Sequence, residues 1–181
     1  MNKIEGLVAA PFTPMFPDGS LNVDIIPAYY DMLEKNNVTG AFICGSTGEG
    51  VSMTQKEKMQ VIEAWASQSR VKKSIKVISL VGGTSYQECR ENAVACYEKG
   101  LSAVAIIAPY YFKPADVHQL ADFCARIGEA VPEMPVYFYH IPVLTGSGLP
   151  MFDFMKAVAP IMPNFAGIKY THEDFMDFQN C

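Results

Sequence analysis

The sequence predicts an α/β fold built from repeated β/α units around a parallel sheet, and two observations lead to it. Short apolar runs recur along the 181 residues, and they are continuous rather than alternating, as in strands buried on both faces. Segments with helical periodicity separate these runs, so each strand is followed by a helix. Half of the residues are apolar, which is enough for a sizeable core and too much for a disordered chain.

The apolar runs predict strands spaced by roughly 30 residues, the length of one strand-helix unit. In chain order, the expected strands are Leu7–Ala10, Ala41–Gly45, Lys76–Val81, Ala103–Ala108, Val136–Tyr139 and Phe165–Lys169. Sequential alternation of this kind implies right-handed crossovers and parallel neighbours.

The helices are predicted from their periodicity and their first residues. The clearest covers Thr54–Ser69, where apolar residues recur every three or four positions. Thr54 with Glu57 has the pattern of a capping box, and so does Ser85 with Glu88 before the next helix. Two later helices are expected to carry a proline in the first turn, Pro114 and Pro150.

Two α/β architectures fit this pattern. A doubly wound open sheet of five or six strands would be complete at this length, whereas a (β/α)8 barrel typically needs about 250 residues. Periodicity by itself favours the open sheet. The chemically suggestive residues favour the barrel, because they follow the carboxyl ends of different strands, where barrels carry their chemistry.

Charge and cysteine usage exclude several classes of function. The chain has 14 basic and 19 acidic residues, a net charge of −5, which argues against a nucleic-acid surface. The densest basic run, Arg70, Lys72, Lys73 and Lys76, is expected to be a solvated loop. Five cysteines without a CxxC pair argue against a disulfide framework or a zinc site. With no apolar leader at Met1–Gly6 and no run long enough for a bilayer, we expect a soluble, cytoplasmic protein without membrane partners.

The first candidate site is the glycine-rich segment Gly45–Gly50 after the second expected strand. Its glycines permit tight turns whose N–H groups can face an anion, and Ser46 and Thr47 add hydroxyl donors. The segment is not a P-loop, because the Lys-Ser/Thr ending is missing. A plain turn in which a hydroxyl caps a short helix would explain the same residues.

The second candidate site is Tyr137–Gly146, which closes the fifth expected strand. Tyr137 and Tyr139 share one face of that strand. A phenol at a strand end can pass protons to and from a substrate when a neighbour positions its hydroxyl. The alternative is a half-buried core tyrosine, with His140 as a structural hydrogen-bonding group rather than a metal ligand.

The third candidate site is Lys169, which ends the sixth expected strand. Burying a charged lysine is costly, and desolvation lowers its pKa towards that of a free amine that can attack a carbonyl carbon. Lys169 is therefore a candidate for Schiff-base formation; the alternative is a lysine whose ammonium reaches solvent. An anion cradle, a phenol and an amine at one end of a sheet together form a site for a carboxylated ketone.

These segments resemble a known family. Gly45–Gly50 (GSTGEG), Tyr139–Gly146 (YHIPVLTG) and Gly167–Thr171 (GIKYT) look like motifs of the pyruvate-dependent class I aldolases. That family includes N-acetylneuraminate lyase and dihydrodipicolinate synthase. Gly6–Met15 and Ala108–Pro114 also resemble its strand ends, so the resemblance spans the chain in order.

The resemblance implies a (β/α)8 TIM barrel, of which this chain supplies about the first six β/α units. Residues 1–181 would form a single barrel domain that stops inside the sixth helix. The resemblance also implies no metal or organic cofactor and a homo-oligomer, usually a tetramer. Tyr110 and Tyr111 resemble an aromatic pair that lies at a subunit contact in some members.

Site roles also follow from the resemblance. Lys169 corresponds to the lysine that forms the imine with the keto carbon, and Tyr139 to the tyrosine that shuttles protons. Ser46 and Thr47 match the pair that holds the keto-acid carboxylate. Thr171 matches a position that contacts the early carbons of the substrate in some members.

Leu144 favours one branch of the family. Dihydrodipicolinate synthases usually have an arginine at this place to bind a second carboxylate, and an apolar residue removes that charge-assisted contact. The implied reaction is reversible cleavage of N-acetylneuraminate, a sialic acid, to N-acetylmannosamine and pyruvate. The alternatives are another aldolase or synthase of this family, a truncated non-catalytic form that binds full-length subunits, and an open-sheet protein that binds an anion at Gly45–Gly50.

Overall fold

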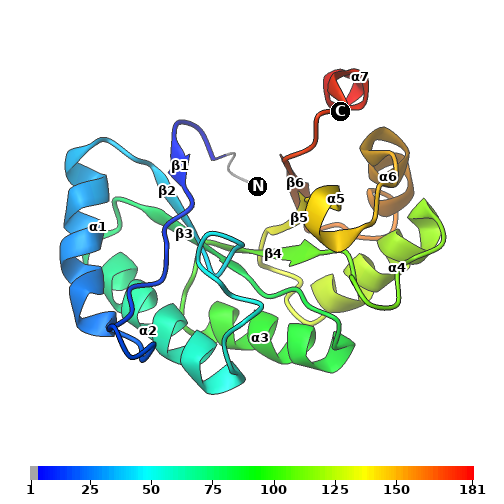
Figure 1. Cartoon of the computed structure of the whole chain (residues 1–181). Helices are drawn as coiled ribbons and strands as arrows, with labels where there is room; N and C mark the ends of the chain where they lie inside the picture. Colours follow the sequence, from blue (N-terminus) through cyan, green and yellow to red (C-terminus); the bar gives the residue numbers. More distant parts are fainter. Residues whose placement is uncertain (1–3) are drawn as a thin grey trace. The chain divides into compact units, whose positions relative to one another are not determined.

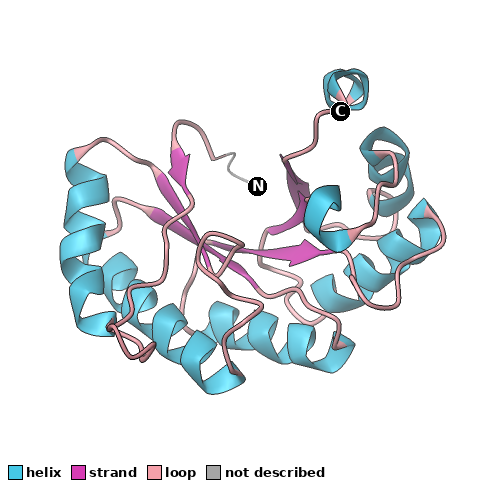
Figure 2. Ribbon diagram, viewed as in Figure 1, coloured by secondary structure: helices cyan, strands magenta, loops and turns pink. Residues whose placement is uncertain are grey.

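The computed structural model describes residues 4–181. Met1–Lys3 belong to the segment Met1–Gly6, where the sequence predicts no apolar leader, and they lie outside the described residues. Helices and strands alternate along the chain (Figures 1 and 2). The described residues divide into two compact units. The N-terminal unit comprises residues up to 80 together with 96–103, and the C-terminal unit comprises 81–95 and 104–181.

Three parallel strands form the sheet of the N-terminal unit, with β2 paired to both β1 and β3. Its elements are β1 (Val8–Ala9), η1 (Val23–Ile25), α1 (Ile26–Lys35), β2 (Gly40–Ile43), α2 (Gln55–Lys72) and β3 (Lys76–Leu80). All of β2 is buried, which accounts for its continuous apolar sequence. Between the helices and the sheet, the buried Tyr30 hydroxyl accepts a hydrogen bond from the Ile75 N–H at 3.0 Å, so this core phenol keeps a partner.

The C-terminal unit repeats the plan, with β5 paired in parallel to both β4 and β6. Its elements are α3 (Tyr86–Glu98, whose last turn belongs to the other unit), β4 (Ala103–Ile107), α4 (Val117–Gly128), β5 (Val136–His140), α5 (Pro142–Thr145), α6 (Met151–Val158), β6 (Phe165–Tyr170) and α7 (Phe175–Asn180). The buried amide of Asn164 contacts the carbonyls of Gly128, Val131 and Met134 at 2.9–3.1 Å. It thereby fixes the end of α4 against the start of β6.

The strand order separates the two architectures considered from the sequence. Within the C-terminal unit, Val81, which follows β3, donates to the Ala105 carbonyl of β4 at 2.9 Å. Within the N-terminal unit, Ser102, which precedes β4, donates to the Val77 carbonyl of β3 at 2.9 Å. The strands therefore follow chain order without the reversal that defines a doubly wound sheet. The open sheet is wrong, and six parallel strands with alternating helices are the first six β/α units of a TIM barrel.

The helix starts agree with the sequence in part. Thr54 and Glu57 form a complete capping box at α2. At α3, the Glu88 N–H donates to the Ser85 hydroxyl at 3.3 Å, as that half of the second box requires. The two prolines lie earlier than expected, because Asp116 caps α4 and Pro150 is itself the extended N-cap of α6.

The cysteines of the described residues are free thiols. Cys44, Cys89, Cys96 and Cys124 are buried and Cys181 is exposed. Burial raises the pKa of the Cys44 and Cys96 thiols to about 12, which leaves them protonated and poorly nucleophilic. Within residues 4–181, each helix is either too short or too polar to cross a membrane.

The basic run Arg70–Lys76 is more ordered than the solvated loop expected from the sequence. Arg70 and Lys72 lie in the last turn of α2, where positive charge favours the carbonyl end of a helix. Lys72 forms an ion pair with Asp31 of α1.

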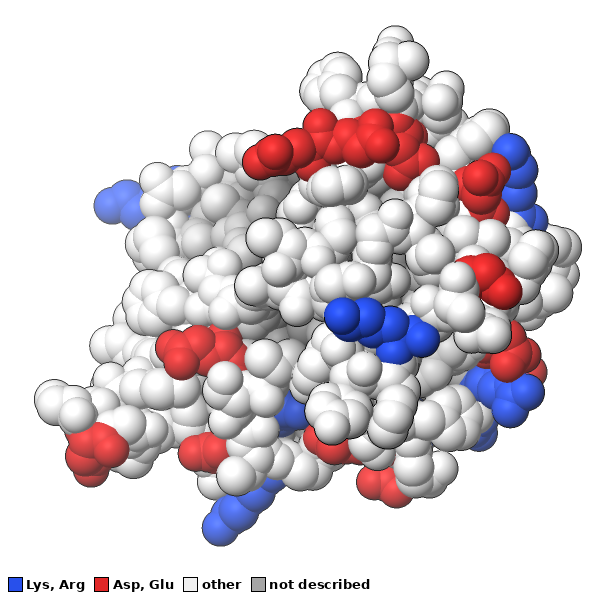
Figure 3. Space-filling model, turned by 45° about the vertical axis from the view of Figure 1, so that its right-hand side comes forward, with Lys and Arg blue, Asp and Glu red and all other residues white. Residues whose placement is uncertain are grey.

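On the face shown in Figure 3, acidic atoms form a continuous row near the upper edge, whereas the basic groups stand singly.

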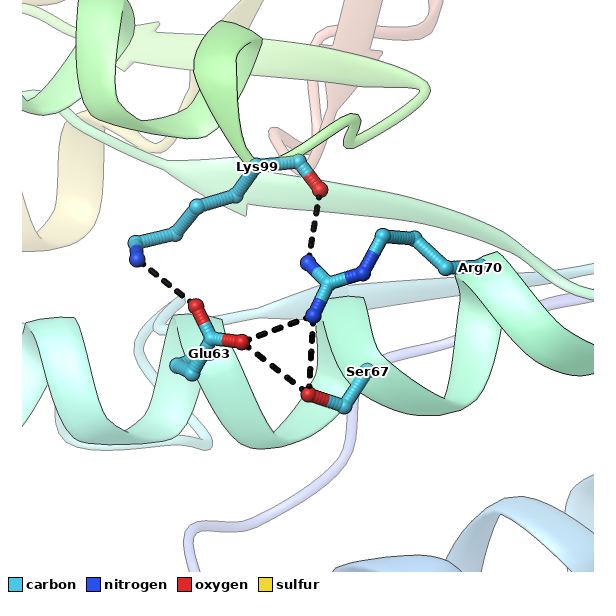
Figure 4. A network of polar contacts seen from close by, with 4 residues as sticks. All are labelled: Glu63, Ser67, Arg70 and Lys99. Carbon is cyan, nitrogen blue, oxygen red and sulfur yellow. Dashed lines mark hydrogen bonds and ion pairs between the residues drawn. The ribbon is translucent and has the colours of Figure 1, made fainter.

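A polar network connects α2 to the segment that precedes β4 (Figure 4). Glu63 accepts from the Lys99 ammonium at 2.6 Å and from the Arg70 guanidinium at 2.8 Å. Ser67 donates to Glu63 at 3.0 Å, and Arg70 also donates to the Lys99 carbonyl at 3.1 Å. The Lys99 and Arg70 side chains lower the pKa of Glu63 to about 2, so its charge persists well into acid.

We expect Glu63→Gln to lower the free energy of unfolding by about 1 kcal/mol near neutral pH, because these side chains are partly exposed and solvent screens them. Because the folded chain lowers the pKa of Glu63 from its ordinary value of 4.5, this carboxylate stabilises the fold at pH values above 4.5. That contribution is lost as the pH falls towards 2. Urea unfolding at pH 7 and pH 3 measures both effects. Asp153→Asn, which removes a single surface pair with Lys156, is the control; an equal loss in the two variants would contradict the network's role.

Candidate functional site at the ends of β5 and β6

The pairing of β5 with β6 brings together two of the residues singled out from the sequence. Tyr139 and Lys169 are register partners on neighbouring parallel strands, so their side chains point to the same face. The Lys169 Nζ atom lies 3.6 Å from the centroid of the Tyr139 ring, a cation–π distance. Tyr139 is buried and Lys169 is half-buried. The amine and the phenol ring are therefore neighbours at the ends of β5 and β6.

A register shift makes this pairing possible. Val136 pairs with Phe165, but Tyr137 pairs with Gly167, so Ala166 is an extra residue in β6. Without the extra residue, Tyr139 would pair with Ile168 and Lys169 would lie on the other face. Gly167 has a φ of +139°, a conformation that only glycine adopts readily. The glycine of GIKYT thus positions the lysine two residues later.

Thr171 lies beside the same strand ends. Its backbone N–H and its hydroxyl both donate to the His140 carbonyl, at 3.0 and 2.8 Å. The hydrogen-bonding ladder therefore continues one residue beyond β6, and it fixes Thr171 at the end of β5, next to the strand that carries Lys169. The structure brings together Tyr139, Lys169 and Thr171 in one place.

Ser46 and Thr47 belong to the N-terminal unit, where they lie exposed on the turn that follows β2. The glycines of this turn are required by close packing. A Cβ atom at Gly50 would lie 1.9 Å from the Cys44 carbonyl oxygen, and one at Gly48 would lie 3.1 Å from the Pro11 carbonyl oxygen. The buried Thr13 hydroxyl donates to the Gly48 carbonyl at 2.6 Å. This packing holds the two hydroxyl-bearing residues at the carboxyl end of β2.

A partly buried polar cluster next to Lys169 was missed from the sequence. The Tyr170 hydroxyl donates to the Asp177 carboxylate at 3.0 Å and to the Asp174 carbonyl at 2.9 Å. Asp177 also accepts from the N–H groups of Met151 and Phe152 at the start of α6, at 2.8 and 3.0 Å. The one sequence signal for this cluster is the Asp-x-x-Asp pattern at 174–177. It is typical of a helix start, and Asp174 does cap α7 by accepting from the Asp177 N–H.

The carboxylate of Asp177 connects β6 to α6 through charge-assisted hydrogen bonds. Burial opposes the ionised form of Asp177, but the N–H groups of Phe152 and Met151 outweigh it and lower the pKa of the carboxyl. Burial and the hydrogen bond to Asp177 raise the pKa of Tyr170 well above its usual range. The strand that carries Lys169 is therefore anchored by a neutral phenol and a carboxylate.

His140 is enclosed by this cluster. Its ring lies 5.0 Å from the Tyr170 ring and 5.5 Å from the His172 ring, and the side chain is 2% exposed. Among the described residues, its Nε2 atom has no hydrogen-bond partner, in contrast to the hydrogen-bonding role expected from the sequence. Burial, assisted by the nearby His172, lowers the pKa of His140 to about 4, so the ring is neutral near pH 7.

Residues 4–181 contain no group of three or more histidine, cysteine, aspartate or glutamate side chains placed to hold a metal ion. What the C-terminal unit offers instead is an amine, a phenol and a threonine at two adjacent strand ends. Leu144 of α5, in the tyrosine motif, is 64% exposed and offers an apolar surface.

Comparison with known proteins identifies the family of this chain. The Dihydrodipicolinate synthetase family profile matches residues 3–181. The chain belongs to this family. It is 38% identical to N-acetylneuraminate lyase from Gallus gallus, over 99% of this chain and 58% of that lyase.

Solved structures give the same assignment. N-acetylneuraminate lyase from Proteus mirabilis superposes with a TM-score of 0.94 at 33% identity, over 99% of this chain and 60% of that chain. A chloride-inhibited dihydrodipicolinate synthase from Acinetobacter baumannii, complexed with pyruvate, has a TM-score of 0.86 at 28% identity, over 97% of this chain and 58% of that chain. The fold expected from the resemblance is therefore confirmed. The chain spans 56–59% of the length of the curated lyases it matches.

The buried His140 gives a prediction for acid stability. The folded chain keeps the ring neutral down to about pH 4, whereas the unfolded chain takes up a proton near the ordinary value of 6.5. The free energy of unfolding is therefore unaffected by this group above pH 6.5 and falls as the pH drops from 6.5 to 4. The loss should be roughly 3 kcal/mol, and His140→Gln should lack it.

Urea unfolding of wild type and variant at pH 7 and pH 4.5 measures this difference. His118→Gln, at an exposed position on α4, is the matched control and should follow the wild-type pH dependence. Parallel pH profiles for wild type and His140→Gln would show that His140 takes up its proton without cost.

Proposed function

We propose that this chain carries the Schiff-base chemistry of a pyruvate-dependent lyase that cleaves N-acetylneuraminate to N-acetylmannosamine and pyruvate. The observation that carries the proposal is the placement of the Lys169 Nζ atom 3.6 Å from the Tyr139 ring, on register partners at the ends of β5 and β6. An amine next to a phenol is the pair that imine formation on a keto acid requires. The identity to N-acetylneuraminate lyases supports the choice of substrate.

The first half of the proposed reaction forms the imine. The neutral Lys169 amine attacks the C2 carbonyl of the substrate, the carbinolamine loses water, and an iminium ion remains. Protons must move onto the departing hydroxyl and off the nitrogen. We assign this relay to the Tyr139 hydroxyl, because Tyr139 is the register partner of Lys169 on the neighbouring strand.

The second half breaks the C3–C4 bond. A base removes the C4 hydroxyl proton, the C3–C4 electron pair moves toward the iminium nitrogen, and N-acetylmannosamine leaves as the aldehyde. The resulting enamine takes up a proton at C3, and water then releases pyruvate and regenerates Lys169. In this scheme the iminium is the electron sink, and each electron pair has a destination without an added cofactor.

The other predicted residues have binding roles in the proposal. Ser46 and Thr47 would hold the keto-acid carboxylate through their hydroxyls at the carboxyl end of β2. Thr171 would contact the early carbons of the substrate. Leu144 supports a sialic acid over a partner with a second carboxylate, because leucine offers no charge to bind one.

The proposal extends to a homotetramer in the cytoplasm. Tyr110 and Tyr111, 38% and 77% exposed, offer the aromatic surface that a subunit contact would bury. Buried free thiols fit a reducing compartment. The proposed partners are the small-molecule substrates and other copies of the chain, without nucleic acid or membrane.

Borohydride trapping with pyruvate tests the imine on this chain. We expect a reduced pyruvyl adduct on Lys169 by peptide mass spectrometry. Lys169→Arg should abolish it, because the guanidinium stays protonated and cannot attack a carbonyl. Pyruvate release from N-acetylneuraminate should disappear in the same variant.

Lys113→Arg is the matched control, because its Nζ atom lies close to Gly146 at the end of the tyrosine motif. This variant should label like wild type. Labelling that survives Lys169→Arg would reject the assignment. A wild-type chain that never labels, yet associates with a full-length lyase, would favour the non-catalytic alternative.

Tyr139→Phe tests the proton relay. The phenyl ring keeps the packing against Lys169, so the fold and pyruvate binding should persist. kcat for N-acetylneuraminate cleavage should fall by roughly 10²–10⁴, the range for loss of a general acid-base group. Tyr137 is half-buried on the same face of β5, so Tyr137→Phe is the control, and its kcat should stay within about threefold of the wild-type value. A Tyr139→Phe enzyme as active as this control would show that Tyr139 only packs.

A further inference from the structure

An open cavity of about 310 Å³ lies in the N-terminal unit, beside the first residue of β3. It is lined by three basic residues, two serines, a glycine and an isoleucine: Arg70, Lys73, Lys76, Ser69, Ser102, Gly100 and Ile75. These residues come from the end of α2, the start of β3 and the segment before β4. Ser46 and Thr47 follow the opposite, carboxyl end of β2, so the cavity is separate from the keto-acid site proposed above.

Positive charge in this cavity is incompletely neutralised. Among the described residues, Asp31 pairs with Lys72 and Glu63 pairs with Arg70 and Lys99, whereas Lys73 and Lys76 have no carboxylate partner. Arg70 uses three of its five N–H donors on Glu63, Ser67 and the Lys99 carbonyl. Two guanidinium donors and two whole ammonium groups therefore remain for a ligand, on a chain whose net charge is −5.

Lys73 occupies a position that suits glycine better than lysine. It caps the end of α2 with a φ of 58°, and its N–H donates to the Ser69 carbonyl at 3.0 Å. A helix cap in this left-handed conformation is usually glycine, since a Cβ atom raises its energy. The cationic side chain favours the carbonyl end of the helix, as in Arg70 and Lys72, and it also lines the cavity. Across the cavity, a Cβ atom at Gly100 would have nothing within 4 Å, so this wall faces open space.

We propose that this cavity binds the phosphate group of a small phosphorylated molecule. A tetrahedral oxyanion with about two negative charges can accept from the Arg70 fork and the two ammonium groups together. The Ser102 hydroxyl supplies a neutral donor for a remaining oxygen, whereas the Ser69 hydroxyl donates to the Ile75 carbonyl at 3.4 Å. The bound anion would bridge α2, the amino end of β3 and the segment before β4.

Isothermal titration calorimetry of the full chain with inorganic pyrophosphate tests the proposal. We expect one saturable site whose affinity falls as the salt concentration rises. Lys76→Gln and Lys73→Gly should each weaken binding by about tenfold, the value of one charge-assisted contact. Lys72→Gln is the matched control from the same basic run; its ammonium is paired with Asp31, so binding should stay within about twofold of wild type.

Inorganic phosphate and ribose 5-phosphate are titrated in parallel. Tighter binding of ribose 5-phosphate would indicate a phosphorylated metabolite as the ligand, and tighter binding of inorganic phosphate would indicate the free anion. Succinate is the arm for the carboxylate class. Equal affinity for succinate and pyrophosphate would overturn the phosphate assignment. The absence of saturable pyrophosphate binding, or equal weakening by Lys72→Gln, would overturn the site.

Thermal unfolding separates ligand binding from folding, because Lys73→Gly relieves the left-handed cap. Its Tm without ligand should equal or exceed that of wild type, while the rise in Tm on adding pyrophosphate should shrink. Amide NMR shifts of Gly100 and Ser102 on pyrophosphate addition should locate the ligand. A lower Tm together with an unchanged pyrophosphate response would show that Lys73 serves the fold alone.

Discussion

The hydrogen-bonded register between β5 and β6 is the constraint on which the candidate site depends. Side chains alternate between faces with a period of two, so one residue more or fewer in β6 would turn Lys169 away from Tyr139. The extra residue Ala166 and the glycine-specific backbone of Gly167 set that register. The amine and the phenol are thus brought together by backbone geometry, before any contact between their side chains contributes.

Polar groups behind β6 keep this geometry rigid. Asp177 accepts from Tyr170 and from the first N–H groups of α6, so it links the strand, the helix beside it and the segment after the strand. Asn164 performs the same task at the other end of the strand, where its amide contacts the carbonyl of the last residue of α4 and two carbonyls between α4 and β5. The Lys169 side chain needs such support to stay beside Tyr139, because an unrestrained lysine would extend into water.

The two ends of the strands serve different purposes. At the carboxyl ends, close packing of glycines in the turn after β2 leaves hydroxyls at the surface, and the β5–β6 register sets Lys169 beside Tyr139. At the amino end of β3, charge compensation around Glu63 holds α2 to the following segments and leaves basic groups in excess. Barrels usually reserve this end for stability, and the phosphate site proposed for the basic cavity would be an exception to that division.

The sequence by itself determined the β/α repeat, the strand positions within one or two residues, and the candidates Lys169, Tyr139, Ser46, Thr47 and Thr171. These follow from local signals: continuous apolar runs, a capping box at Thr54, and chemically unusual residues at strand ends. The choice of barrel over open sheet needed the strand order, because both folds share one local pattern. Only the tertiary structure paired Tyr139 with Lys169, enclosed His140, and joined Asp177 to α6. Each of these depends on contacts between residues far apart in sequence, which no local periodicity encodes.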